Sequence, residues 1–280
     1  MGQEQTQVLA FHSLSLQVRC RVTGMNLERR AAQSLLAFWA EAGVEALYLD
    51  TPRDRMAVAP VPRLPATKPA IVSSTPDQSA GRDLAWAAHD LEALAAAIAA
   101  FDGCALKREG ARQAVCWRGA VDAPVMIVGE APGADEDAQG SPFVGRAGRL
   151  LDKMLAAAGL EGRILITNTV FWRPPGNRTP TPEEQLACAP FLERAIDLVR
   201  PKLLLFVGAA AAKSMLGANE GILALRGRWF EWRARHTDLE IPAMPTLHPA
   251  FLLRQPGAKK RAWQDLLTLT ERLDRGDRPA

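Results

Sequence analysis

Residues 125–133 read VMIVGEAPG, in which four consecutive apolar residues end abruptly in a turn of glycine and proline. A run of this kind, without polar alternation, is typical of a strand that is covered on both faces. Similar runs follow at 164–166 and 203–207. A fourth, at 244–247, contains Pro245, which favours an edge strand.

Helical sequence separates these apolar runs. The stretches 83–101, 146–158, 182–199 and 210–216 are predicted helices. Pro182 suits the first turn of the third of them, and the two glutamates that follow suit the positive end of its dipole. Alternating strands and helices predict an α/β fold with a parallel sheet.

The N-terminal part of the chain differs in composition. Residues 1–58 contain one amphipathic stretch, about 27–42, with Asn26 as its helix cap. Residues 59–82 hold five prolines together with Ser, Thr and Gly, a composition typical of an extended linker. We therefore expect an extension with a helix over 1–58, a linker over 59–82, and a folded domain over 83–280.

The overall composition excludes several classes of protein. The 280 residues are 48% hydrophobic and 23% charged, which is ordinary for a globular protein. No apolar run approaches the roughly 20 residues of a membrane span. Four widely spaced cysteines and an N-terminus without a secretory pattern lead us to expect a reducing, cytoplasmic location.

The net charge of +3 is unevenly distributed. From Arg200 onward there are fourteen Lys and Arg against eight Asp and Glu, with aromatic residues interleaved. A basic segment of this kind is either a solvent-exposed face or a surface that binds nucleic acid. Arg173 and Arg178 lie on a proline-rich loop, and Lys259 and Lys260 form a cluster suited to DNA phosphates.

Chemically distinctive residues follow each predicted strand. Glu130 follows the first, Asn168 the second, Gly208 the third and His248 the fourth, while Phe143 lies on a nearby loop rich in Gly and Pro. Four of them have an alternative structural explanation: Glu130 as a cap, Asn168 as a turn residue, His248 as a hydrogen-bonded histidine and Phe143 as a core aromatic. Because ligands bind at the carboxyl ends of parallel strands, their joint occurrence favours a site there.

These residue types suit a planar heterocycle such as a nucleobase. A side-chain amide can hydrogen-bond an imide edge, an aromatic ring can stack on a base, and an imidazole can stabilise a departing anion. A phosphate site is less favoured, since neither GxGxxG nor GxxxxGK[ST] is present and an acidic turn follows the first strand.

Three motifs resemble those of the family 4, thermophile-type uracil-DNA glycosylases. They are GEAPGADEDAQGSPFVGRAGRLLDKML at 129–155, ITNTVFWRPPGNRTPTPEEQLAC at 166–188 and TLHPAFLLR at 246–254. The similarity covers about 101–273 in order and spacing. It implies a three-layer α/β/α sandwich around a four-stranded parallel sheet. It also implies a monofunctional hydrolase of base excision repair, which flips deoxyuridine out of DNA and cleaves its N-glycosidic bond.

The resemblance also implies roles for individual residues. Phe143 would stack on the uracil, Asn168 would hydrogen-bond its edge, and His248 would stabilise negative charge at O2. Glu136 would position water, and Glu130 would shape the pocket. The backbone of the pocket would come from Gly129, Ala131, Pro132 and Gly133.

The resemblance further implies that the loop 249–254 enters the duplex. The expected DNA contacts are Arg173, Arg178, Phe251, Leu252, Arg254, Lys259 and Lys260. The expected partner is uracil-containing DNA, single- or double-stranded, bound by a monomer without a membrane. Two alternatives stay open: a glycosylase for deaminated purines, and a non-catalytic module that binds single-stranded DNA.

Relatives with a [4Fe–4S] cluster hold it on four cysteines. Cys104 and Cys188 match two of these positions, but Lys107 and Trp172 stand at the other two, and Cys116 fits none. Because such a cluster normally needs four thiolates, we expect no cofactor.

Overall fold

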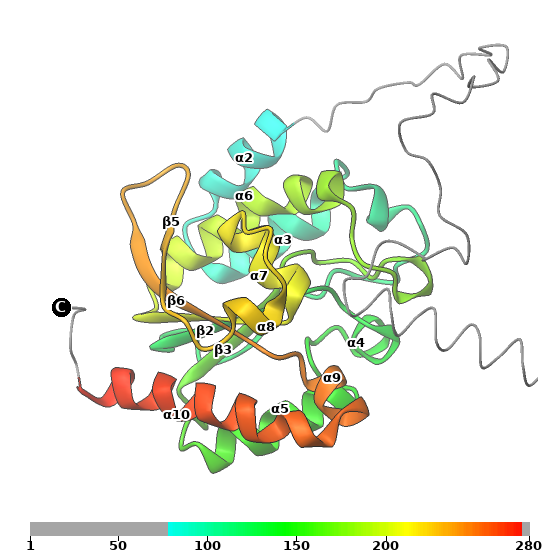
Figure 1. The fold of residues 1–280 in the computed structure, drawn as a ribbon. Coiled ribbons are helices and arrows are strands. Elements are labelled where there is room, and N and C mark those ends of the chain that lie inside the picture. Colours follow the sequence, from blue (N-terminus) through cyan, green and yellow to red (C-terminus); the bar gives the residue numbers. More distant parts are fainter. Residues whose placement is uncertain (1–77, 276–280) are drawn as a thin grey trace, which may run out of the picture. The chain divides into compact units, whose positions relative to one another are not determined.

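The computed structural model describes residues 78–275, which form a sheet covered by helices on both faces (Figure 1). The predicted helix at 27–42 and most of the predicted linker lie outside the described residues. Residues 78–82, the end of that linker, are helical.

The centre of the sheet is four parallel strands, as the sequence predicts. These strands are β3 (Ile164–Asn168), β2 (Val125–Gly129), β4 (Leu203–Val207) and β6 (Glu240–Thr246), given in spatial order. The sheet is larger than predicted, because a short antiparallel strand extends it at each side. The additional strands are β1 (Trp117–Gly119), paired with β3, and β5 (Phe230–Arg233), paired with β6.

The prediction that the fourth strand lies at the edge of the sheet is wrong. β6 pairs with β4 on one side and with β5 on the other. The pairing with β5 ends at Ala243, so Pro245 faces no strand there, and its carbonyl instead accepts a hydrogen bond from the Gly227 N–H at 2.9 Å. Proline is therefore accommodated without breaking a ladder.

The faces of the sheet carry separate apolar clusters. On one face, Val125 and Ile127 pack with residues of α5 (Arg146–Ala157) and α10 (Lys259–Arg275). On the other, Met126 and Val128 pack with residues of several helices. These helices include α2 (Gln78–Ala87), α3 (Leu91–Ala100), α6 (Pro182–Val199) and α7 (Ala209–Leu216). The predicted three-layer arrangement is confirmed (Figure 1).

The stretch 83–101, predicted as one helix, is two. Asp90 begins α3, and its side chain accepts a hydrogen bond from the Ala93 N–H at 2.7 Å. An aspartate in this cap position satisfies a backbone donor that would otherwise be unpaired, so it starts a new helix.

Short elements complete the described part of the chain. The remaining helices are α4 (Ala134–Gln139), α8 (Ile222–Leu225) and α9 (Pro249–Arg254), with 3-10 turns η1 (Ala105–Lys107), η2 (Pro175–Asn177) and η3 (Pro256–Ala258). Among residues 78–275, no helix is long and apolar enough to cross a membrane.

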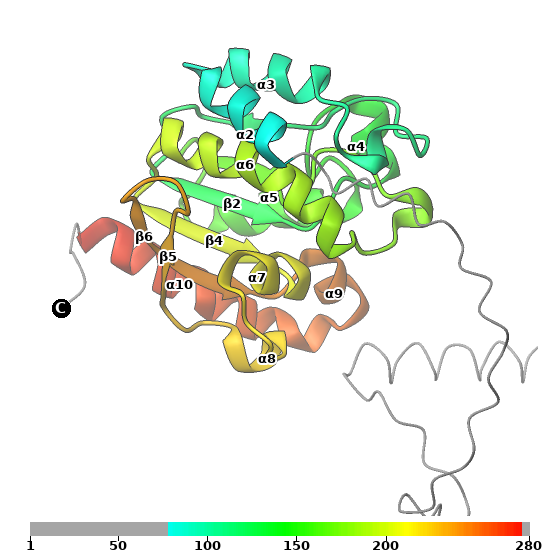
Figure 2. The ribbon, with the colours of Figure 1, turned by 90° about the horizontal axis from the view of Figure 1, so that it is seen from above.

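The order of the strands determines where a ligand site can lie. β2 is flanked by β3 and β4, and the connection to β3 carries α5 on one face while the next connection carries α6 on the other. A crevice opens at the carboxyl ends of strands where the winding reverses in this way. α4 and α9 lie beyond the end of the sheet to which the β4 arrow points (Figure 2).

Candidate active site

Asn168, the last residue of β3, has a buried side-chain amide without a hydrogen-bond partner. The residue is 1% exposed, and neither Oδ1 nor Nδ2 is bonded to another described residue. An unsatisfied buried polar group costs roughly 1–3 kcal/mol. The described residues therefore leave both ends of this amide available to a ligand.

Gly129 lies opposite Asn168 in the register of β2 and β3. A Cβ at Gly129 would lie 2.5 Å from Oδ1 of Asn168 and 2.6 Å from the ring of Phe143. Only glycine allows the amide and the aromatic ring to approach the backbone together.

Phe143 has a strained backbone. Its φ is +55°, a left-handed conformation that costs a bulky residue roughly 1–3 kcal/mol, and its side chain is buried. Gly148 in α5 permits this conformation, because a Cβ there would lie 1.6 Å from the Phe143 carbonyl oxygen. Strain of this kind at a ring beside an unpartnered amide indicates a functional site.

His248 stands at the start of α9, where its Nδ1 accepts a hydrogen bond from the Ala250 N–H at 3.1 Å. A neutral ring with Nδ1 as acceptor carries its proton on Nε2. Burial lowers the pKa of His248 to about 4, with a further lowering by Arg254 that Glu136 opposes. The imidazole is therefore neutral at pH 7 and offers an Nε2–H donor.

The His248 ring lies beside that of Phe143, with 5.8 Å between the ring centroids. Its position depends on Gly208, which has a φ of +99° and where a Cβ would lie 3.1 Å from Cβ of His248. The structure thus brings together Asn168, Phe143 and His248, which the sequence predicted as neighbours.

Glu136 connects two loops of the site through its carboxylate. Its Oε2 accepts a hydrogen bond from the Gly133 N–H at 3.0 Å, and its Oε1 accepts one from the Gly145 N–H at 2.9 Å. The carbonyl of the half-buried Glu130 accepts a hydrogen bond from Oγ1 of Thr169 at 2.6 Å. The predicted roles of both glutamates stay predictions.

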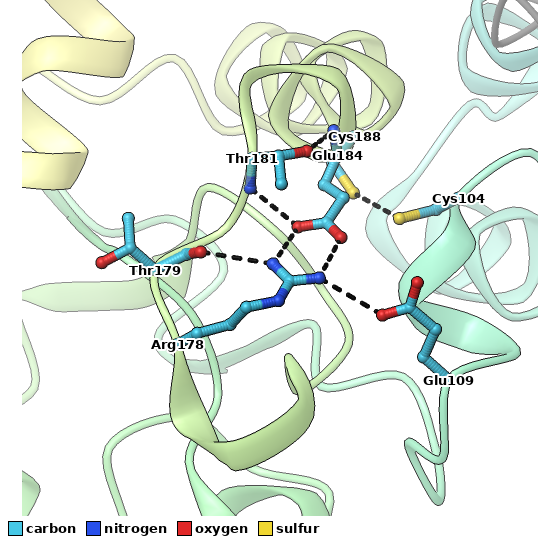
Figure 3. Close-up of polar contacts among 7 residues, drawn as sticks. All are labelled: Cys104, Glu109, Arg178, Thr179, Thr181, Glu184 and Cys188. Atoms are coloured by element: carbon cyan, nitrogen blue, oxygen red, sulfur yellow. Dashed lines mark hydrogen bonds and ion pairs between the residues drawn. The ribbon is translucent and has the colours of Figure 1, made fainter. Parts of the chain in front are cut away.

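The predicted DNA contacts have different environments. Lys259 and Lys260 are exposed in the first turn of α10. Arg173 donates a hydrogen bond from Nε to Oδ1 of Asn177 at 2.7 Å. Arg178 donates from both terminal nitrogens to Glu184, at 2.8 and 2.6 Å, and also reaches Glu109 (Figure 3).

The loop expected to enter the duplex is the short helix α9. Leu252 is fully buried in a cluster with Leu247 and Ala262, and Phe251 packs against it. Leu253 is 38% exposed. The sequence prediction named Leu252 and not the exposed Leu253, because without the helix nothing distinguishes one leucine from the next.

Cys104 and Cys188, which match two cluster positions, face each other with 3.9 Å between their sulfur atoms (Figure 3). The hydrogen bond from Cys188 lowers the pKa of the Cys104 thiol, and burial raises that of Cys188. Burial also raises the pKa of the separate Cys116 thiol to about 12.

The other two cluster positions hold different chemistry. Nζ of Lys107 is hydrogen-bonded to Asp102 and to the Ala99 carbonyl, both at 2.7 Å, and Trp172 is buried against Phe171. Across residues 78–275 no three His, Cys, Asp or Glu side chains gather as for a metal ion. Two thiols, an ammonium and an indole do not fit a four-thiolate cluster.

Residues 116–267 match the family described as the uracil DNA glycosylase superfamily. The chain is 38% identical over 182 residues to a type-4 uracil-DNA glycosylase of Pyrobaculum aerophilum, covering 63% of this chain and 91% of the relative. Proteins of the same name from Sulfurisphaera tokodaii and Thermotoga maritima are each 41% identical, over 164 and 142 residues. These alignments cover 56% and 50% of this chain, and 74% and 71% of the relatives.

Proposed function

Because the chain belongs to the uracil DNA glycosylase superfamily, we propose that it excises uracil from DNA. The reaction hydrolyses the N-glycosidic bond of deoxyuridine and leaves an abasic site for base excision repair. The unpartnered, buried amide of Asn168 is the observation that carries this proposal. The names of the relatives support it independently.

Asn168 supplies both halves of a pair with the uracil imide. Its Oδ1 accepts from N3–H of the base and its Nδ2 donates to O4, while the flipped base stacks on Phe143. Cytosine presents an acceptor at N3 and a donor at the neighbouring exocyclic amine, so it opposes an amide held in this orientation.

His248 stabilises the leaving group. The bond from C1′ to N1 breaks with its electron pair moving to the base, and negative charge develops at O2 of uracil. The Nε2–H of a neutral imidazole donates to that oxygen, which lowers the barrier where charge develops. Water then bonds to the cationic sugar carbon, and the proton it loses neutralises the departing uracil anion. Glu136 orients this water through lone pairs that the backbone hydrogen bonds leave available.

DNA contacts surround this pocket. Lys259 and Lys260 bind phosphates, Arg173 supports the strand from the proline-rich loop, and Leu253 fills the space of the flipped nucleotide. Arg178 serves the fold instead, since its charge is already opposed by Glu184 and Glu109. The enzyme acts as a monomer. It acts without iron, because the donor set around Cys104 suits no cluster.

A panel of oligonucleotides tests this function. Each oligonucleotide carries one test base: uracil in a single strand, uracil opposite guanine or adenine, thymine, cytosine, hypoxanthine or xanthine. Excision of that base is detected by alkaline cleavage of the strand at the abasic site. We expect cleavage at uracil and none at thymine or cytosine. A preference for hypoxanthine or xanthine would identify a purine glycosylase, and salt-sensitive binding without abasic product would identify a binding module.

A further inference from the structure

We propose that Arg118 is a positioning residue that holds Phe143 in the conformation needed to stack on the base. The inference rests on the function proposed above and adds a residue from outside the strand-end loops. Arg118 lies in β1, the short antiparallel strand at the side of the sheet.

The register of the sheet directs Arg118 toward the Phe143 loop. Arg118 pairs directly with Ile166 of β3, and Ile166 packs in the same cluster as α5 and Phe143. Residues opposite each other in neighbouring strands share a face, so the arginine side chain extends over that face. Gly119 allows β1 to approach β3 closely, because a Cβ at this position would lie 2.2 Å from the Ile164 carbonyl oxygen.

The guanidinium of Arg118 holds two consecutive carbonyls of the loop. Its Nε donates to the Pro142 oxygen at 2.6 Å, and its Nη2 donates to the Phe143 oxygen at 3.2 Å. The same Nη2 lies 2.6 Å from Oδ1 of Asp152 in α5. The planar group thus connects β1, the loop and α5 in one arrangement.

These contacts act where the backbone is strained. The positive φ of Phe143 would relax if the loop were free to rotate, and the ring would then leave its place beside Asn168. Arg118 restrains the carbonyls on both sides of the Phe143 nitrogen and Cα. Lysine lacks the planar fork needed to bind two carbonyls and a carboxylate simultaneously.

The expected effect is on binding of the base. Stacking on Phe143 is made in the ground state as well as in the transition state, so its loss raises KM more than it lowers kcat. Free uracil would bind the same ring, and its inhibition constant should rise by a similar factor. A general loss of structure would not raise KM and the inhibition constant of uracil by a similar factor while kcat changes little.

The test compares Arg118→Gln with Arg163→Gln, a matched control whose arginine is ion-paired with Asp274 away from the loop. We expect Arg118→Gln to raise KM on a uracil-containing single strand, and the inhibition constant of uracil, roughly tenfold, as for a lost charged hydrogen bond. kcat should change little, Arg118→Lys should recover part of the loss, and the control should match wild type.

A double-mutant cycle separates positioning from stability. Adding Arg118→Gln to Phe143→Ala should change nothing further, because the ring that Arg118 positions is gone. Equal losses in both backgrounds, or an Arg118→Gln variant like the control, would overturn the role of Arg118. If Phe143→Ala itself excised uracil normally, the proposed function of the ring would fail instead.

Discussion

The rings of Phe143 and His248 lie 5.8 Å apart between centroids and are inclined by 34°, although one follows β2 and the other follows β6. The unpartnered amide of Asn168 lies close to the same Phe143 ring, at the end of the neighbouring strand β3. A base that stacks on Phe143 can turn its edge toward Asn168 and one carbonyl toward His248. Recognition and leaving-group stabilisation would then depend on one orientation of the base.

Replacing Asn168 by alanine should separate activity from stability. The variant should lose at least about 100-fold in single-turnover excision, as for removal of a charge-stabilising donor. Its melting temperature should be unchanged or higher, because a buried amide without a partner is removed. Asn219→Ala, at an exposed position, serves as control. A clear drop in melting temperature would assign the amide a structural role.

Residues at strand ends could be predicted from sequence because continuous apolar runs identify the buried strands. The positions of Asn168 and His248 follow from that alone. Contacts between distant segments could not be predicted: Arg118 reaches Phe143 only because the three-residue β1 pairs with β3. Likewise, Leu253 rather than Leu252 is exposed because residues 249–254 form a helix, whose pattern is too short to recognise.

Uracil excision should persist at acidic pH. Because the pKa of His248 is lowered to about 4, its neutral form is present at pH 5 as at pH 7. The contribution of His248 to kcat should therefore stay constant between pH 7 and pH 5 and change only as pH approaches 4. A single-turnover pH profile measures this, with His248→Gln as the variant in which that dependence is absent. Loss of the His248-dependent step near pH 6.5 would mean that the ring titrates normally.

The same lowered pKa predicts a pH dependence of stability. Between about pH 4 and pH 6.5 the unfolded histidine binds a proton that the folded one does not, so the free energy of unfolding rises with pH across that window. Above pH 6.5 the histidine is neutral in both states, so the free energy of unfolding no longer depends on its titration. Urea unfolding at pH 5 and pH 7 should show a smaller difference in His248→Gln than in wild type.

Gly129→Ala should disrupt the site without a comparable change in the fold. The new Cβ would lie 2.5 Å from Oδ1 of Asn168 and 2.6 Å from the Phe143 ring, so both must move. We expect uracil excision to fall at least about 100-fold, since small misplacements of this kind carry such costs. Gly221→Ala is the control, because a Cβ there meets nothing within 4 Å. Near-normal excision by Gly129→Ala would contradict the assigned geometry.

Arg178 and Lys260 should respond oppositely to the same substitution. Arg178→Gln leaves the buried carboxylate of Glu184 without its main partner, so the melting temperature should fall while DNA affinity changes little. Lys260→Gln should leave the melting temperature unchanged and weaken DNA binding. Its log–log salt slope should decrease by roughly 0.7–0.9, the value for one lost phosphate contact. The reverse assignment of effects would place Arg178 on the DNA.

The pair Cys104 and Cys188 should contribute packing and not metal binding. Both side chains are fully buried, so Cys104→Ala and Cys188→Ala should each destabilise by about 1 kcal/mol, the usual cost of a small core truncation, and should keep excision activity. Iron analysis and absorption near 400 nm of the anaerobically purified protein test the same point. Stoichiometric iron that is lost in Cys188→Ala would show that these two thiols hold a cluster with ligands other than Lys107 and Trp172.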